Sequence, residues 1–347
     1  MRSYWAGFSL AVALVALVGF VLVRHRTLEA PTASPPVHFD RIVLLVLESY
    51  RSDKVDPASI PGNPFLTKLA SENRFAANYF GVWKPSLPNY LAMIGGDTFD
   101  VSNNHASCFG PDPGKSCNSI DAPNLVDQLE KADISWEGLF ESMPNVGFLG
   151  SRFPDHSPLY AQKHNPFVYF NNIALDAKRL AKLKPFVLSD LKAELANPAS
   201  ASRFIFLVPN LCNDEHGARS CRPDSAAIAA GNAFLAKVVP AIIDSPAFTD
   251  RSVLFITWDN SDGNDACCGA WFGGGRIPLI SVTKHSKKVI STTPANHVSL
   301  LATIEDGFGL PRLATTKDAS TLFDLFPDFA GARRHRTDET IAPRVDP

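Results

Sequence analysis

The chain has 347 residues, of which 45% are hydrophobic and 20% are charged, and its formal net charge is -2. This composition is typical of a globular protein and excludes an intrinsically disordered chain. The length is sufficient for one large α/β domain or two ordinary domains with a sizeable buried core. A charge so close to neutral gives no general electrostatic basis for binding nucleic acid, so any anion site must be local.

Near the N-terminus, residues 4–23 carry no charge. At about 1.5 Å per residue in a helix, such a run can cross a hydrocarbon core of ~30 Å. The basic residues 24–26 follow directly, which favours an uncleaved anchor over a cleaved signal peptide. The small residues 32–34 leave cleavage open, and a buried core helix is a third interpretation. We therefore expect residues 1–26 to be a membrane anchor or a signal segment.

The rest of the chain divides into three parts. Residues 27–38 are rich in proline and predict a linker. Residues 39–329 predict the folded domain, and residues 330–347, with several arginines and prolines, predict a flexible tail. An anchor ahead of the domain would place the domain on the periplasmic or extracellular side of a cell membrane, whereas cleavage would release it as a secreted protein. The charges on both sides of the apolar run do not settle the orientation.

The six cysteines bear on the same question. Two pairs are each nine residues apart and could close short surface loops, and a third pair is adjacent in sequence: Cys108 with Cys117, Cys212 with Cys221, and Cys267 with Cys268. Six cysteines allow 15 pairings, so the first two pairs are a preference and the state of the adjacent pair stays open. Reduced cytosolic thiols are the alternative, but a membrane segment ahead of the domain favours an oxidising compartment.

Four runs of β-branched and aliphatic residues predict buried strands. They cover residues 41–47, 204–208, 253–257 and 277–282. Helix-like segments lie at residues 226–243 and 298–305, and Gly307 is the expected C-cap of the latter. Strands that alternate with helices predict an α/β fold with a mostly parallel central sheet and helices on both faces.

Polar side chains follow three of these strands. They are Glu48 and Ser49 after the first, Asn210, Asp214 and His216 after the second, and Asp259 and Asn260 after the third. The carboxyl ends of parallel strands are where α/β folds place their ligands. Carboxylate and amide oxygens that converge there suit a divalent cation. Each of these residues alone is an ordinary turn residue, so the prediction depends on the convergence.

Residues 84–92, KPSLPNYLA, form the most specific stretch. Pro88 suits the first turn of a helix, which places Ser86 at a helix N-terminus, where backbone N–H groups and the helix dipole favour negative charge. A serine at this place is ordinarily a simple N-cap. It could act as a nucleophile only if a metal ion or a base activated it, and the strand-end carboxylates could hold that metal.

With further motifs, the chain resembles a known family. In order, these are Leu47-Glu48, Asn78-Tyr79, Pro85 to Tyr90, His164-Asn165-Pro166-Phe167, Pro209-Asn210 with Asp214 and His216, Thr257-Trp258-Asp259, and His297 with residues 299–301 and 303–306. This order over residues 40–315 is similar to the phosphoesterase family of acid phosphatases, phosphatidylinositol-phosphate phosphatases and bacterial phospholipases C. That family belongs to the alkaline-phosphatase-like superfamily.

The resemblance implies a role for each matching residue. Ser86 would be the nucleophile and form a phosphoserine, and Glu48 and Asp259 would bind the metal ion together with the Ser86 oxygen. The phosphoryl oxygens would be bound by Asn89, His164 and His216, and one of the two histidines would protonate the leaving alcohol. Further candidates for substrate binding are Lys84, Asn210, Asp214 and His297.

This sequence departs from the family pattern at three of these positions. Ser49 and Asn260 stand where the family commonly has Asn and Glu, and Lys84 stands where it usually has His. Both replacements beside the carboxylates should weaken cation binding or change which cation is preferred. Lys84 could partly replace a phosphate-binding donor. Asp262 or Asp265 could supply the missing carboxylate.

Three functions are therefore open. The first is a phosphomonoesterase of the acid-phosphatase type, dependent on one divalent metal ion of unknown identity, acting on small phosphate esters or phosphoinositide head groups. The second is a phosphodiesterase of the phospholipase C type on the same fold. The third is a catalytically reduced, anchored binding protein, which the residues at 49 and 260 suggest. In each case the partners are a phosphate ester and, through residues 1–26, a membrane, with no nucleic acid.

Overall fold

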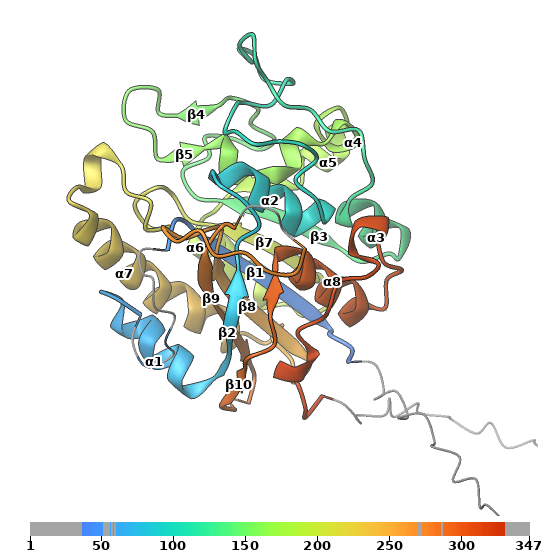
Figure 1. Cartoon of the computed structure of the whole chain (residues 1–347). Helices are drawn as coiled ribbons and strands as arrows, with labels where there is room; N and C mark the ends of the chain where they lie inside the picture. The colour runs from blue at the N-terminus through green and yellow to red at the C-terminus, as the bar shows by residue number, and fades with distance from the viewer. Residues whose placement is uncertain are drawn as a thin grey trace, which may run out of the picture. The chain divides into compact units, whose positions relative to one another are not determined.

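The computed structural model describes residues 37–50, 56, 58, 60–269, 273–285 and 287–329. The expected N-terminal anchor, nearly all of the expected linker and the expected C-terminal tail lie outside the described residues, so these three expectations stay predictions. The described residues of the unit Pro35–Pro347 form a mixed α/β fold around one large sheet (Figure 1).

The sheet contains nine strands in the order β10-β2-β9-β8-β1-β7-β3-β6, with β11 paired to β2. The bounds are β1 Arg41–Leu47, β2 Arg74–Phe80, β3 Trp136–Phe140, β6 Leu183–Pro185, β7 Phe204–Val208, β8 Ser252–Trp258, β9 Arg276–Thr283, β10 Val289–Ser291 and β11 Ala295–Asn296. A separate pair of short strands, β4 Arg152–Phe153 and β5 Tyr160–Ala161, is antiparallel.

Helices cover both faces of the sheet. Helix α7 contacts α1 and α6 on one side, and α8 contacts α2, which also contacts α3, on the other side (Figure 1). The bounds are α1 Pro64–Glu72, α2 Ser86–Gly95, α3 Leu125–Lys131, α4 Asn171–Ala174, α5 Ala177–Leu180, α6 Leu188–Leu195, α7 Asp224–Ile243 and α8 His297–Phe308.

Strand β1 lies at the centre of the sheet and positions the site. It pairs in parallel with β7 on one edge and with β8 on the other. All residues of β1, β7 and β8 are buried, as the aliphatic runs predicted for strands covered on both faces. Because these neighbours are parallel, the residues that follow them emerge at the same edge of the sheet.

The expected strands are all present, and the predicted fold class is confirmed. The five adjacent strands β8-β1-β7-β3-β6 are all parallel to one another. Strand β9 is antiparallel to both β8 and β2. The expected end of α8 was wrong. The helix continues to Phe308 and is capped by Gly309, with φ of +70°. Gly307 lies inside the helix, where a β-carbon would collide with the ring of Phe39.

The two preferred cysteine pairs are confirmed as disulfides. Cys108 is bonded to Cys117 and Cys212 to Cys221, and the adjacent Cys267 and Cys268 are also bonded. Disulfides are typical of oxidising compartments.

Among the described residues, one helix, α7, is long and apolar enough to cross a membrane when length and composition alone are considered. In this fold its buried residues, among them Gly231, Leu235 and Val239, face the interior, and α7 contacts α1 and α6. A core helix of this kind meets the same criterion, so α7 adds little to the case for a membrane protein.

Candidate active site

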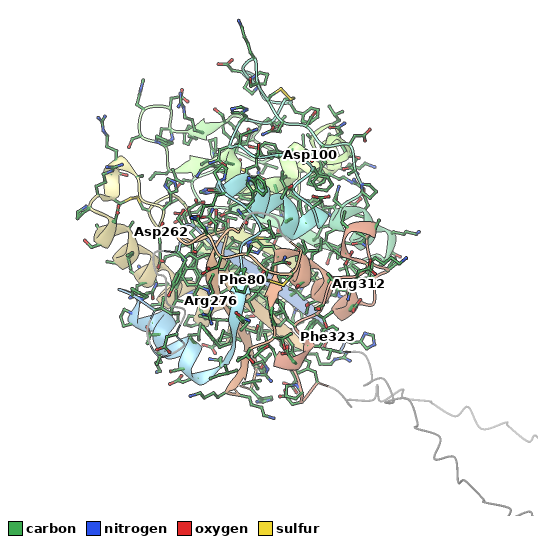
Figure 2. All side chains as sticks on the ribbon, in the orientation of Figure 1. Phe80, Asp100, Asp262, Arg276, Arg312 and Phe323 are labelled. Atoms are coloured by element: carbon green, nitrogen blue, oxygen red, sulfur yellow. A yellow bond between two sulfur atoms is a disulfide. The ribbon has the colours of Figure 1, made fainter. Side chains whose placement is uncertain are left out.

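The residues that follow β1, β7 and β8 meet at the carboxyl edge of these strands. The backbone N–H of Glu48 donates to the carbonyl of Asp214 at 2.8 Å, and the N–H of Asp259 donates to the carbonyl of Leu47 at 3.0 Å. The loop after β8, which contains Asp262 (labelled in Figure 2), is tied to the same place, because the N–H of Asp262 donates to the carbonyl of Tyr50 at 3.1 Å. We call the side chains that gather here the strand-end cluster: Glu48, Ser86, Lys163, His164, Asp214 and His216.

Ser86 is the first residue of α2 and lies directly against the end of β1. Its hydroxyl donates to Oε1 of Glu48 at 2.5 Å, and its side chain is nearly buried. Pro85 is the N-cap residue of α2 and makes no side-chain hydrogen bond to the helix. Ser86 is therefore not the N-cap, and its hydroxyl donates to the carboxylate of Glu48. The fold thus brings Ser86 against Glu48, 38 residues earlier in the chain, and the role of Ser86 as a nucleophile stays a prediction.

The loop before Ser86 is held by Asn89. Oδ1 of Asn89 accepts from the N–H groups of Val82 and Trp83, and Nδ2 donates to the carbonyls of Trp83 and Pro85. Both amide hydrogens are therefore used inside the protein. In this arrangement Asn89 positions the loop that precedes Ser86, and direct contact of Asn89 with substrate stays a prediction.

His164 lies between two buried carboxylates. Its Nε2 contacts Oε2 of Glu48, and its Nδ1 is 3.3 Å from Oδ2 of Asp214. The ring of Tyr90 from α2 stacks on the imidazole, with ring centroids 5.1 Å apart and planes 19° apart. The stack and the two carboxylates fix the orientation of the ring, so small rotations of His164 would break several contacts at once.

The charges in this cluster perturb one another strongly. Burial alone would raise the pKa of Glu48, but the positive charges of His164 and Lys163 hold it well below its ordinary value of 4.5. Burial lowers the pKa of His164, but the negative charge of Glu48 and the contacts with the carboxylates of Asp214 and Glu48 together outweigh burial and raise this pKa to about 9. Glu48 and His164 therefore form an ion pair at neutral pH. Burial raises the pKa of Asp214.

The donor set of this cluster suits a metal ion. One ligand atom each from Glu48, His164 and Asp214 lies within 4.8 Å of the other two, and all three residues are buried. Glu48 Oε2, His164 Nε2 and Asp214 Oδ2 have no hydrogen-bond partner of acceptable geometry among the described residues, although the histidine and carboxylate atoms are close. Imidazole nitrogen and carboxylate oxygen are ligands for zinc and for other first-row transition metals.

Asp259, Ser49 and Asn260 lie beside the strand-end cluster. Oδ1 of Asp259 accepts from the N–H groups of Ser49 and Asn260, and Oδ2 accepts from the side-chain amide of Asn260. The hydroxyl of Ser49 donates to Oε1 of Glu48 at 3.0 Å. Burial, followed by the negative charge of Glu48, raises the pKa of Asp259 to about 8. A cation near Glu48 and Asp259 would offset this repulsion, and binding of a metal by Asp259, Ser49 and Asn260 stays a prediction.

Lys163 belongs to the cluster, but sequence reasoning did not assign it a role. Its Nζ is 3.2 Å from Ser86 Oγ, 3.6 Å from Glu48 Oε1 and 3.4 Å from His216 Nε2. The signal that could have found Lys163 is its place directly before His164 in the matching motif. His216 is partly buried, and its Nδ1 lies 2.8 Å from the carbonyl of Gly217.

Three other predicted residues make contacts outside the cluster. Lys84 donates to the carbonyl of Asp262 at 2.8 Å. Both ring nitrogens of the buried His297 have partners, the carbonyl of Asp259 and the hydroxyl of Tyr79, and burial lowers its pKa to about 4. His297 is therefore neutral and supports the end of β8.

Asn210 is the third. Its Oδ1 accepts from the N–H groups of Cys212 and Asn213, and its Nδ2 donates to Ser142. These contacts shape the turn that leads from β7 to Asp214. Substrate binding by Lys84, Asn210 and His297 stays a prediction.

Several known proteins are similar to this chain in sequence. The Phosphoesterase family matches residues 46–311, a range that contains the whole strand-end cluster. The phosphate-repressible acid phosphatase of Penicillium chrysogenum is 31% identical over 298 residues, covering 84% of this chain and 65% of that protein. The phosphatidylinositol-3-phosphatase of Mycobacterium tuberculosis is 29% identical over 291 residues, covering 82% of this chain and 83% of that protein. The chain thus spans slightly less than two thirds of the Penicillium enzyme.

Solved structures agree on the fold. A protein of the alkaline phosphatase superfamily from Vibrio parahaemolyticus matches with a TM-score of 0.54 and 12% identity, covering 82% of this chain and 69% of that one. The lipoteichoic acid synthase LtaP from Listeria monocytogenes matches with a TM-score of 0.50 and 12% identity, covering 83% of this chain and 76% of that one. The chain belongs to the Phosphoesterase family and has the fold of the alkaline phosphatase superfamily.

Proposed function

We propose that this protein hydrolyses phosphate monoesters through a phosphoserine at Ser86, with the help of one divalent metal ion. The observation that carries the proposal is the hydroxyl of Ser86 at the start of α2, which donates to Glu48 at 2.5 Å and lies 3.2 Å from Lys163. A nucleophile needs a group that favours its deprotonated form. A carboxylate that accepts its hydrogen bond and a cation beside its oxygen meet that need.

In the first step, the oxygen of Ser86 forms a bond to phosphorus while the bond from phosphorus to the alcohol oxygen breaks. The proton of the serine hydroxyl leaves along the hydrogen bond to Glu48, and one proton ends on the released alcohol. Phosphoryl transfer depends mainly on positioning and on neutralising charge. The backbone N–H groups at the N-terminus of α2 would position the phosphoryl group, and the side chains of Lys163 and His164 would help to neutralise its charge.

In the second step, water attacks the phosphoserine, the bond from phosphorus to Ser86 breaks, the proton held by Glu48 returns to the Ser86 oxygen, and inorganic phosphate leaves. His216 is suited to move the protons. Its Nδ1 lies 2.8 Å from a carbonyl oxygen, which can only accept, so the neutral ring carries its hydrogen on Nδ1 and can accept a proton on Nε2. We propose that His216 gives a proton to the leaving alcohol and takes one from water.

The metal ion would be held by Glu48, Asp259 and the hydroxyl oxygen of Ser86, with Ser49 and Asn260 beside it. A divalent ion at this place supplies charge stabilisation for the nucleophile and for the transferring phosphoryl group. We favour this set over Glu48, His164 and Asp214 because it includes the nucleophile. Metal content of two variants separates the sets: Asp259→Asn should lose the ion and Asp214→Asn should keep it. The reverse result would move the ion to the second set.

The relatives and the disulfides support proposals for the substrate class and the location. The names of the relatives support small phosphate esters or phosphoinositide head groups as substrates. Three disulfides support a catalytic domain, residues 39–329, outside the cytoplasm. Residues 1–26 would then hold this domain at the outer face of a membrane. Digestion with an added protease, of intact cells and of cells whose outer layers have been removed, tests the location, because a cytoplasmic domain would survive both treatments.

The activity is tested with purified protein and p-nitrophenyl phosphate. We expect release of phosphate that a chelator abolishes and that added metal restores. Ser86→Ala should lower kcat by at least about 10³-fold, and mass spectrometry of the acid-quenched wild-type protein should find phosphate on the peptide that contains Ser86. Turnover by Ser86→Ala at the wild-type rate, or phosphate on a different residue, would disprove the proposed nucleophile.

A further inference from the structure

Lys163 occupies a special place among the charged groups of the strand-end cluster. Its ammonium group contacts the proposed nucleophile, Ser86 Oγ, at 3.2 Å and the proposed proton carrier, His216 Nε2, at 3.4 Å. The phosphorus atom must come within bonding distance of Ser86 Oγ, and the leaving oxygen must come near the proton carrier. An ammonium group that contacts both lies beside the path of the transferring phosphoryl group.

Lys163 is also the more exposed of the two cations in the cluster. Its side chain is 18% exposed, whereas that of His164 is 4% exposed and that of Glu48 is fully buried. His164 is held between Glu48 and Asp214, so its charge is already balanced by two carboxylates. Lys163 faces Glu48 at the longer distance of 3.6 Å. An entering anion therefore meets the ammonium group of Lys163 before it meets the imidazole.

We propose that Lys163 is a catalytic residue that determines specificity: its ammonium group contacts a non-bridging oxygen of the phosphoryl group and makes the site prefer monoester dianions to diester monoanions. This inference rests on the proposed function and decides a question that the relatives leave open. Lys163 takes no part in the exchange of bonds, which proceeds as described for Ser86. Its role is to supply fixed positive charge at the reacting oxygens.

The preference follows from charge. A phosphate monoester carries close to two negative charges at neutral pH, because its second pKa is about 6, whereas a diester carries one. Coulomb attraction scales with the product of the charges, so removing the ammonium group costs the dianion about twice as much as the monoanion. Replacing Lys163 by an uncharged side chain of similar size should therefore lower monoester turnover more than diester turnover.

The test compares kcat/KM for p-nitrophenyl phosphate and bis(p-nitrophenyl) phosphate in the full-length protein and three variants. For Lys163→Gln we expect the ratio of monoester to diester turnover to fall at least about tenfold, about 1.4 kcal/mol of discrimination. Lys163→Arg keeps the charge and should keep most of the ratio. Lys178→Gln, at an exposed lysine in α5, is the matched control and should change neither rate. An equal fall for both esters in Lys163→Gln would overturn the inference.

Binding of inorganic phosphate gives a readout that does not need turnover. At about pH 8, where phosphate is a dianion, calorimetry should show binding at least about tenfold weaker to Lys163→Gln than to the wild type and to Lys163→Arg. If the wild type turns over neither ester, the proposed function fails, and the phosphate titration still judges Lys163. Equal binding by the wild type and Lys163→Gln, with equal thermal melting, would overturn the role of Lys163 by itself.

Discussion

Glu137 offers a sharp test of the physical reasoning because it lies outside the strand-end cluster. This residue is on β3 and its side chain is 1% exposed, with Oε2 accepting from Lys184 Nζ at 2.7 Å. Burial, followed by the nearby carboxyl group of Glu194, raises the pKa of Glu137 to about 7, and Glu137 contributes to a lowered pKa of Glu194. The ion pair with Lys184 opposes this shift without cancelling it. Folding therefore holds a proton on Glu137 that the unfolded chain would lose near 4.5.

The sign of the effect on stability follows from the protons bound in each state. Between about pH 4.5 and pH 7 the folded state binds more protons at Glu137 than the unfolded state, so the free energy of unfolding falls as the pH rises. The difference between about 7 and 4.5, at about 1.36 kcal/mol per pKa unit, gives a penalty of at most about 3 kcal/mol above pH 7. Glutamine at this position cannot ionise, so the penalty should disappear.

Urea denaturation at about pH 5 and about pH 8 measures the effect. We expect Glu137→Gln to unfold with nearly the wild-type free energy at the lower pH and to be more stable than the wild type at the higher pH, by less than about 3 kcal/mol because the lowered pKa of Glu194 offsets part of the penalty. Glu72→Gln, at an exposed position at the end of α1, is the control and should show no such pH-dependent difference. A difference between Glu137→Gln and the wild type that stays constant over this range would refute the assignment.

Three further substitutions test other parts of the argument. Ser49 has a φ of +46°, which asparagine tolerates better than serine, so Ser49→Asn should raise the free energy of unfolding by about 0.5–1 kcal/mol; a lower melting temperature would contradict this. Asn89→Ala removes the acceptor for the N–H groups of Val82 and Trp83, so it should lower the free energy of unfolding by about 1–3 kcal/mol in thermal denaturation. It should also lower kcat more than it changes KM, and an unchanged kcat would show that the loop does not need this support. Leu44→Ala in the middle of β1 should cost about 2–5 kcal/mol in urea denaturation, and a cost below about 1 kcal/mol would contradict close packing around the central strand.

The strands that were predicted are those that contain long runs of β-branched and aliphatic residues. Strands β1 and β7 were predicted with the observed bounds because β7 is entirely aliphatic or aromatic and β1 is entirely aliphatic after Arg41. Strand β2, with the sequence RFAANYF, was not predicted because the small and polar residues 76–78 interrupt its apolar pattern and because it begins with Arg74, which is fully buried. Its charge is balanced by Asp328, 254 residues away, at 2.7 Å, and by the ring of Phe326. A partner so distant in sequence leaves no local pattern.

The site was predictable to the extent that it depends on strand ends. Glu48 and Asp214 were recognised because they follow buried strands, and His164 because of its motif. The sequence could not tell which amide groups are already satisfied by backbone, and so Asn89 was expected at the substrate although its four hydrogen bonds hold the loop. Lys163 was passed over because a lysine in a loop is ordinarily a solvated side chain. Its position depends on how residues 162–164 fold against α2.

The strand-end cluster lowers the stability of the folded state, which is the strongest physical reason to regard it as functional. Glu48 and Asp214 of the cluster, and Asp259 beside it, are fully buried carboxylates, and buried charges are commonly less stabilising than apolar side chains of the same volume. Pairing with His164 and Lys163 offsets part of the free-energy cost of burying these carboxylates. Apolar side chains could replace the ion pairs without loss of stability, because the core of the sheet is formed by β1, β7 and β8. Groups that destabilise the fold and contact a hydroxyl at a helix N-terminus are best explained by what that hydroxyl does.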